Sequence, residues 1–154
     1  MKLDPKVNQQ LNSVLKSLLT GINQYFLHSR MYENWGFDTL KSKNYSYSIL
    51  LMKESDKLIK RILFLQGLPN LQDLGCLTIG TDVEESLKGN MTFEAELRQS
   101  LIAAIEICES LKDYISRDCL TEILEESEEQ IDWLEIQAHL LGKMGPENYL
   151  QSVL

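Results

Sequence analysis

The helical stretch that ends near Leu65 has two apolar faces, and this feature constrains the fold more than any other. One face consists of Leu51, Leu58, Ile62 and Leu65 with Glu54 on the same line, and the other of Tyr45, Ile49, Met52, Ile59 and Leu63. A helix in a monomeric bundle buries one apolar stripe and leaves the rest in water. The second face therefore predicts an additional neighbour, either another subunit or a ligand.

A long amphipathic segment precedes this stretch. Asp4 and Pro5 are typical of an N-cap followed by proline in the first turn, and apolar residues then recur at helical spacing until Gly36 ends the segment. We expect Asp38 to cap the second helix and residues 67–69 to end it. Two long helices thus occupy the first half of the chain.

The second half repeats this organisation after a long connection. Residues 70–82 contain apolar anchors without a sustained period, which suits a crossover that joins parallel helices. Asp82 and Glu85 resemble a capping box that opens a third helix. A turn within residues 113–118 separates the third helix from a fourth, which closes over residues 142–145. The sequence predicts an all-α fold, a four-helix bundle with one long crossover and a short fifth helix at the C-terminus.

Length and charge restrict the class of protein. We expect one domain over residues 1–154, since this length can bury a proper core. The net charge of -8 argues against nucleic acid or an anionic membrane as partner, and no apolar run is long enough to cross a bilayer. Residues 1–5 lack the apolar core of a secretion signal, so we expect a cytoplasmic protein. Three cysteines without a C-x-x-C pair indicate reduced, packed thiols: Cys76, Cys108 and Cys119.

Four polar residues fall on lines that should face the core: Glu54, Glu94, Ser127 and Gln130. Buried polar groups either satisfy one another or hold a metal. A di-iron centre in a four-helix bundle uses one Glu from each of two helices and a Glu-x-x-His pair from each of the other two. The sequence contains no Glu-x-x-His, and its only histidines are His28 and His139. A hydrogen-bonded polar core is therefore favoured over a di-iron centre.

Met52 lies in the middle of the second apolar face. A methionine there can be core filler, because its thioether packs well against irregular surfaces. It can also be a soft metal ligand. Around a two-fold axis, two copies of Met52 would face each other and could supply both axial ligands of one haem.

Several segments resemble the bacterioferritin family. They are residues 22–31 (INQYFLHSRM), 61–75 (RILFLQGLPNLQDLG), 113–118 (DYISRD), 131–135 (IDWLE) and 144–150 (MGPENYL). The resemblance covers essentially the whole chain. It implies a ferritin-like bundle, a 24-subunit shell of octahedral symmetry that stores iron as a ferric mineral, and one haem b at each subunit dimer.

The resemblance also assigns a haem site. Met52 stands where the family has its haem ligand. Six neighbours are similar to the wall of the family's haem pocket: Leu19, Ile22, Asn23, Phe26, Tyr45 and Ile49.

The family's ferroxidase site is preserved at one position only. Glu94 keeps the family residue of the third helix. The other five positions differ: Leu18 and Leu51 replace glutamates of the first two helices, Glu54 replaces the histidine of the second, and Ser127 and Gln130 replace the glutamate and histidine of the fourth. Ser46 and Leu50 replace the family's histidine and carboxylate on the cavity side of the second helix. Glu54 and Glu94 could hold at most one weakly bound cation.

Three hypotheses follow. The first is an iron-storage shell subunit that binds haem, has no catalytic residues of its own, and co-assembles with a ferroxidase-active bacterioferritin subunit. The second is a homo-oligomeric shell with residual ferroxidase activity through Glu54, Glu94 and Glu128. The third is a haem-binding or purely structural cage that stores no iron.

The resemblance further implies an electron-delivering partner, the bacterioferritin-associated ferredoxin. We expect Leu68 and Glu85, which flank the crossover, to contact it. Alternatively, Leu68 is only a contact that stops the second helix.

Overall fold

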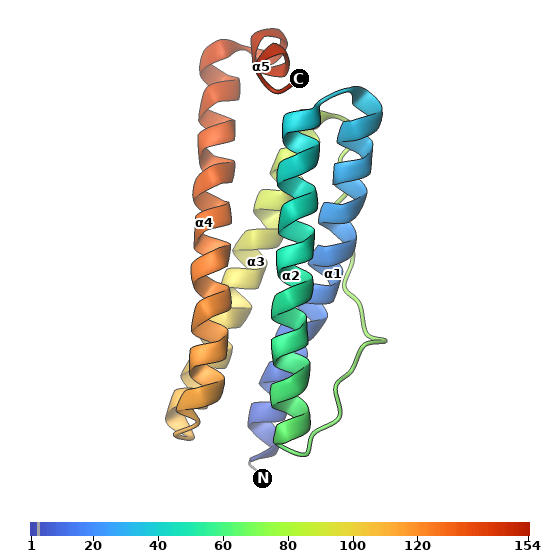
Figure 1. Cartoon of the computed structure of the whole chain (residues 1–154). Helices are drawn as coiled ribbons and strands as arrows, with labels where there is room; N and C mark the ends of the chain where they lie inside the picture. Colours follow the sequence, from blue (N-terminus) through green and yellow to red (C-terminus); the bar gives the residue numbers. More distant parts are fainter. Residues whose placement is uncertain (3) are drawn as a thin grey trace.

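A computed structural model of the chain consists of long helices packed side by side (Figure 1). It describes residues 1–2 and 4–154, so Leu3, in the N-terminal segment considered above, lies outside the described residues. The described residues form α1 (Pro5–Trp35), α2 (Asp38–Phe64), α3 (Val83–Ser110), α4 (Tyr114–Met144) and α5 (Pro146–Ser152), and no strand occurs among them. The predicted all-α class, with its short fifth helix, is confirmed.

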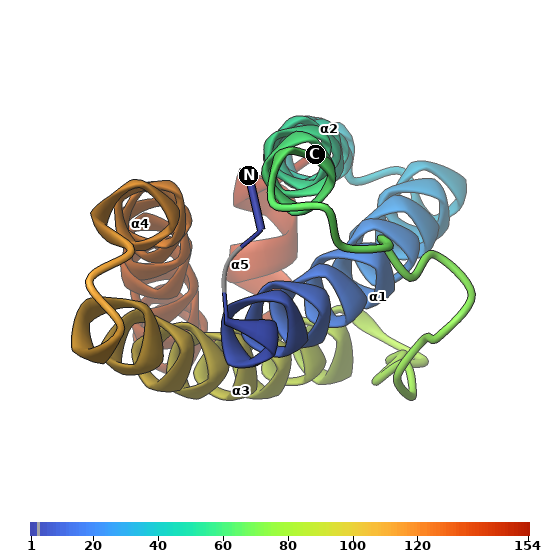
Figure 2. The ribbon, with the colours of Figure 1, turned by 90° about the horizontal axis from the view of Figure 1, so that it is seen from below.

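The helices form two antiparallel pairs. α1 packs against α2, and α3 packs against α4. The connection from α2 to α3 runs along the outside of α1, so α2 and α3 point in the same direction (Figure 1). α4 packs along α3 and makes few contacts with α2 (Figure 2). This is the bundle with one long crossover that the sequence predicts.

The limits of α1 agree with the sequence. The Asp4 side chain accepts a hydrogen bond from the Lys6 amide at 2.9 Å, and Pro5 occupies the first turn. Gly36 ends the helix with φ of 88°, a left-handed conformation that glycine adopts without strain.

The limits of α2 differ from the prediction. Phe37 holds the N-cap position, and Asp38 is already the first helical residue, so the expected Asp38 cap is wrong. The helix ends at Phe64, before Gly67. Gln66 takes the left-handed conformation with φ of 61°, while the Gly67 amide donates to the Ile62 carbonyl at 2.9 Å. This is a Schellman motif, in which Gln66 and not Gly67 takes the left-handed conformation, and Gly67 follows it.

The ends of α3 and α4 follow the prediction more closely. The Glu85 amide donates to Asp82 Oδ1 at 2.8 Å, as in a capping box, but Glu85 Oε2 accepts from the Thr81 amide instead of the Asp82 amide. Asp113 caps α4 within the predicted turn. Gly142 lies inside α4, and only Gly145 ends it.

An ion pair ties α2 to the turn between α3 and α4. Arg61 Nη2 lies 2.7 Å from Asp113 Oδ1, and Arg61 Nε donates to Ser116 Oγ at 2.8 Å. The Asp113 side chain is almost completely buried. Removing either residue would leave the other charge largely buried without an opposite charge beside it, so this pair helps to fix the relative positions of α2 and α4.

The core consists of leucine-rich stripes from all four long helices. Leu111 at the end of α3 and Ala138 beside a cavity on α4 are exposed. A second apolar cluster closes the α5 end and consists of Tyr32, Leu40, Val83, Leu87, Leu134, Tyr149 and Val153. In the part of the chain that the structure covers, no helix has an apolar stretch that could cross a bilayer.

The cysteines are only partly packed. Cys108 is buried, and Cys119 is half-buried, as expected for packed thiols. Cys76 is exposed on the crossover, so the expectation of packing is wrong for this residue. The crossover lies on the surface of α1, where every residue from 70 to 78 is exposed, including the predicted apolar anchors of this segment.

Side chains of α1, spaced one turn apart, hold the crossover in place. Thr20 Oγ1 accepts from the Gly75 amide at 2.8 Å, Gln24 Oε1 from the Thr78 amide at 2.9 Å, and His28 Nε2 from the Gly80 amide at 3.1 Å. Residues at positions i, i+4 and i+8 lie on one face of a helix. This ladder satisfies backbone amides of the crossover that would otherwise lose hydrogen bonds to water.

His28 is the buried end of this ladder. Because Nε2 accepts a hydrogen bond, the proton of the neutral ring lies on Nδ1, which donates to Asn90 Oδ1 at 2.8 Å. Burial lowers the pKa of His28, and the bond to Asn90 partly opposes this effect. Residue spacing does not predict that His28 joins α1, α3 and the crossover.

Replacing His28 with glutamine should change how stability depends on pH. The pKa of folded His28 lies below its ordinary value of about 6.5, so the unfolded chain takes up the proton first. The stabilisation from neutral His28 is therefore complete above about pH 6.5 and is lost as the pH falls through that value toward the lower folded pKa. We expect thermal unfolding midpoints to fall less on acidification in His28→Gln than in the parent chain.

The control is His139→Gln, since His139 is exposed on α4. This variant should keep the pH dependence of the parent. An identical pH dependence of the unfolding midpoint in His28→Gln and the parent would contradict the assignment.

Candidate haem face and polar centre

An uncovered apolar face lies along α1 and α2. We define the α1–α2 face as Leu19, Ile22, Asn23 and Phe26 of α1 with Tyr45, Ile49 and Met52 of α2. Leu19, Ile22 and Ile49 are half-buried, whereas Phe26 and Tyr45 are exposed. The rings of Phe26 and Tyr45 meet across the two helices, with centroids 6.4 Å apart.

Met52 stands out on this face. Its side chain is 53% exposed, although it lies among apolar neighbours on a helix whose opposite stripe is fully buried. The apolar surface continues along α2 through half-buried Ile59 to exposed Leu63. Met52 is therefore not core filler of its own bundle. Its thioether is available to a partner or a ligand.

On the opposite side of α2 lies a polar centre, defined by six positions from all four long helices: Leu18, Leu51, Glu54, Glu94, Ser127 and Gln130. All six side chains are buried. The predicted inward placement of the four polar residues is thus confirmed. Leu18 and Leu51 belong to the main apolar cluster, so part of the centre is filled by hydrocarbon.

Glu94 is buried beside two tyrosines. The Tyr47 hydroxyl donates to Glu94 Oε1. Burial raises the pKa of Glu94 to about 8, and the hydroxyls of Tyr47, Ser127 and Tyr25 oppose this rise. Burial, followed by the charge of Glu94, raises the pKa of Tyr25 and Tyr47 well above 10. At neutral pH, Glu94 therefore carries its proton in most molecules.

Glu54 has a different partner. Lys57 Nζ lies 3.3 Å from Glu54 Oε1 and 3.0 Å from Glu122 Oε2. This ammonium bridges α2 and α4 at the edge of the centre. The two carboxylates that remain in the polar centre thus differ, because Glu54 is paired with a cation and Glu94 with a hydroxyl.

Several polar atoms of the centre make no hydrogen bond within the described part of the chain. They are Tyr25 Oη, Glu54 Oε2, Glu94 Oε2, Ser127 Oγ, and both Nε2 and Oε1 of Gln130. Among residues 1–2 and 4–154, no three His, Cys, Asp or Glu side chains are grouped so that they could hold a metal ion. Unpaired buried oxygen and nitrogen atoms of this kind are usually satisfied by ordered water.

Comparison with known proteins identifies the family. Residues 8–144 match the ferritin-like domain family. The chain is 43% identical to bacterioferritin from Brucella melitensis over 151 residues, which cover 98% of this chain and 94% of the relative. It is 41% identical to bacterioferritin from Mycobacterium leprae, with 97% and 94% covered, and 40% identical to a bacterial ferritin from Pseudomonas aeruginosa, with 99% of each covered. The chain belongs to the bacterioferritin family.

Family membership confirms the resemblance on which the site was predicted. In this bacterioferritin chain, the structure places Tyr25 beside Glu94 and Gln130, and Ser127 beside Glu94. It does not bring Glu128 to them, because Glu128 is exposed and pairs with Arg98 at 3.0 Å. Glu128 therefore does not belong to the polar centre, contrary to the hypothesis that included it.

Three residues that lie beside the centre were not predicted from the sequence, namely Tyr25, Tyr47 and Lys57. A signal for the tyrosines exists, since Tyr25 lies seven residues after Leu18 and Tyr47 lies seven residues before Glu54, on the same inward lines. No comparable signal exists for Lys57, because its contact with Glu122 depends on how α4 approaches α2.

The residues that flank the crossover have different environments. The Leu68 side chain is 83% exposed, while its backbone carbonyl accepts from Asn12 Nδ2 at 3.1 Å. Leu68 is thus tied to α1 by its backbone, and little of its side chain packs against the end of α2. Glu85 is held by Thr81, whose backbone and hydroxyl hydrogen bonds lower its pKa.

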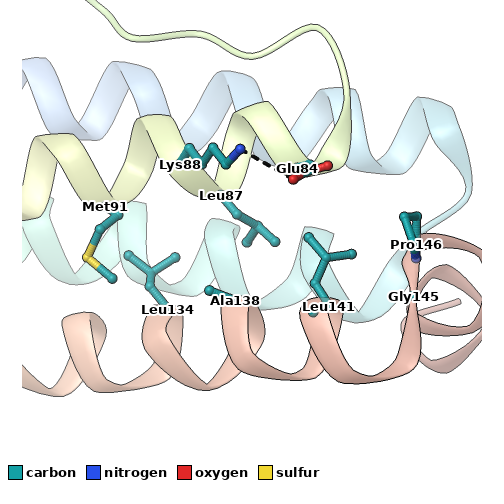
Figure 3. Close-up of a pocket in the computed structure, with 10 residues that line it drawn as sticks. Glu84, Leu87, Lys88, Met91, Leu134, Ala138, Leu141, Gly145 and Pro146 are labelled. Atoms are coloured by element: carbon teal, nitrogen blue, oxygen red, sulfur yellow. Dashed lines mark ion pairs between the residues drawn. The ribbon is translucent and has the colours of Figure 1, made fainter.

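A separate apolar cavity of about 420 Å³ lies between α3 and α4 near α5 (Figure 3). Met91, Leu87 and Leu134 point into it. The charged pair at its rim, Lys88 and Glu84, lies one turn apart on α3 at 3.3 Å. None of these residues belongs to the α1–α2 face or the polar centre.

Replacing Glu94 with glutamine should stabilise the chain in alkali. A folded pKa of about 8 lies above the ordinary value of 4.5, so the folded chain binds the proton more tightly than the unfolded chain. This stabilisation is complete below about pH 4.5 and is lost as the pH rises through about 8. Glu94→Gln mimics the neutral acid, so its thermal unfolding midpoint should exceed that of the parent by a margin that grows with pH.

Glu128→Gln provides the matched control, because Glu128 is exposed. Its midpoint should follow that of the parent throughout the pH range. A constant difference between Glu94→Gln and the parent at all pH values would contradict an ionisation of Glu94 near pH 8.

Proposed function

We propose that this chain is an iron-storage shell subunit that binds haem b through Met52 and lacks a complete di-iron ferroxidase centre. The observation that carries the proposal is the contrast between the two sides of α2. One side presents an exposed thioether among apolar and aromatic residues. The other side faces the polar centre, where Leu51 of α2 and Leu18 of α1 are buried at positions where the family has metal-binding glutamates.

The residues of the α1–α2 face fit a haem. Apolar and aromatic groups such as Ile22, Phe26 and Tyr45 can cover a porphyrin, and Met52 can ligate its iron. One subunit supplies a single thioether, so a second copy related by a two-fold axis would supply the other. When bound, haem supplies one-electron transfer, and the apolar wall excludes water from its iron.

The residues of the polar centre do not fit two iron ions. Bridging carboxylates must hold the metals together and balance their charge. Leu18 and Leu51 offer no donor atoms, which leaves Glu94 as the one carboxylate kept from the family's ligand set. Glu54 is already paired with Lys57. We therefore assign this chain no catalytic residue, and Glu54 and Glu94 remain only the residues nearest to a vestigial metal site.

The proposed assembly is the 24-subunit shell of the family around a ferric mineral. The uncovered apolar face is the part of the surface that a second subunit would bury. A shell without its own oxidation site would fill slowly, so we propose co-assembly with a ferroxidase-active bacterioferritin subunit. We propose that the bacterioferritin-associated ferredoxin covers the exposed side chain of Leu68, which would remove this apolar surface from water.

Met52→Leu should abolish haem binding while leaving the fold intact. Leucine preserves the apolar volume but has no donor atom. The purified parent protein should give a low-spin visible spectrum typical of two thioether ligands, and the variant should lose it. Met91→Leu is the control, because Met91 lies in the α3–α4 cavity and should retain the spectrum. A low-spin spectrum unchanged in Met52→Leu would refute the assignment.

The chain expressed alone should oxidise Fe(II) slowly. We expect no rapid phase with a stoichiometry of two irons per subunit, because the bridging carboxylates are missing. Glu94→Ala should leave the rate unchanged. A rapid phase that disappears in Glu94→Ala would instead favour residual ferroxidase activity in a homo-oligomeric shell. Isolated protein without any ferric core, even after co-expression with an active subunit, would favour a haem-binding or structural cage.

A further inference from the structure

We infer that Arg30 binds a carboxylate of the haem and thereby favours haem over a porphyrin whose carboxylates are esterified. This inference rests on the proposed function, since it adds a positioning residue to the site that contains Met52.

Arg30 continues the haem-facing line of α1. It lies four residues after Phe26, which itself follows Ile22 and Asn23 on the same side of the helix. Its guanidinium lies 5.0 Å from the centre of the Phe26 ring and 5.3 Å from the centre of the Tyr45 ring. The cation is thus held against two aromatic residues of the α1–α2 face, at the end where this face changes from apolar to polar.

This end of the face has an excess of positive charge. Arg30 Nη1 and Lys41 Nζ share a single carboxylate oxygen, Glu33 Oε2, at 3.6 Å and 3.3 Å. A cavity of about 360 Å³ lies directly beside them and is lined by Arg30, Lys41, Ser42, Tyr45 and Ser46. Two cations with one counter-ion next to an open space favour a second anion, although the chain as a whole is acidic.

The position suits the edge of a porphyrin. Tyr45 precedes Met52 by two helical turns, or roughly 10 Å along the axis. An anion at the polar end of the face would therefore lie at the edge of the porphyrin, away from Met52, which would bind the iron at its centre. A guanidinium that stacks on aromatic rings can still donate its N–H groups to a carboxylate that lies in the plane of the guanidinium. Haem carries two carboxylates, and a two-fold dimer provides two copies of Arg30, one for each.

Two porphyrins that differ only in these carboxylates provide the test. Haem-free protein is titrated with haem and, separately, with haem dimethyl ester, and the affinities are measured by absorbance. The parent should bind haem roughly tenfold more tightly than the ester or better, as expected for a charge-assisted hydrogen bond. Arg30→Gln should bind both forms about equally, and Arg30→Lys should retain part of the preference because it keeps the charge without the fork.

The matched control is Arg98→Gln. Arg98 pairs with Glu128 on the α3–α4 side of the molecule, so this variant should keep the full preference for haem. Circular dichroism and size-exclusion chromatography establish that each variant folds and assembles. Lys53→Gln tests the rival cation, which follows Met52 directly in the sequence.

The outcomes separate the two proposals. If the parent binds haem without preferring it to the ester, or if Arg30→Gln keeps the preference, the role of Arg30 is overturned while haem ligation stands. The same holds if only Lys53→Gln removes the preference. If neither porphyrin binds the parent protein, the proposed haem function itself fails.

Discussion

The presence of apolar surface on two sides of α2, only one of which the bundle itself buries, is the constraint on which the rest of the structure depends. The inner stripe of α2 packs into the bundle, and the outer stripe remains in water in the isolated chain. Exposed apolar area of this kind favours association, because covering it releases water from hydrocarbon. Folding and assembly thus depend on one helix, and Met52 lies on the side that assembly would cover.

The polar centre shows how the free-energy cost of burying charged groups is reduced. A carboxylate in an apolar interior is favoured only when it is neutral or paired, and the two glutamates meet this requirement differently. Glu94 keeps its proton beside Tyr47, whereas Glu54 reaches the edge of the centre and meets Lys57. Leu18 and Leu51 fill the space beside them with hydrocarbon and belong to the main apolar cluster.

Much of this arrangement was predictable from residue spacing. The four inward polar residues and the uncovered second face of α2 follow from helical period alone, and both are confirmed. The predicted limits of α2 were wrong by one residue at the start and by three at the end. Phe37 and not Asp38 is the N-cap, and the helix ends at Phe64, before left-handed Gln66. Helix ends depend on local hydrogen bonds that several neighbouring residues can form equally well.

The sequence by itself determined which side chains point inward and which family the chain resembles, since both depend on local order along the chain. Only the tertiary structure decided the partners of those side chains. Lys57 reaches Glu122, His28 accepts from Gly80, and Arg30 lies over Tyr45 because separate helices and the crossover approach one another. Such contacts join residues far apart in sequence, and helical period fixes the direction of a side chain but not the distance to the next helix.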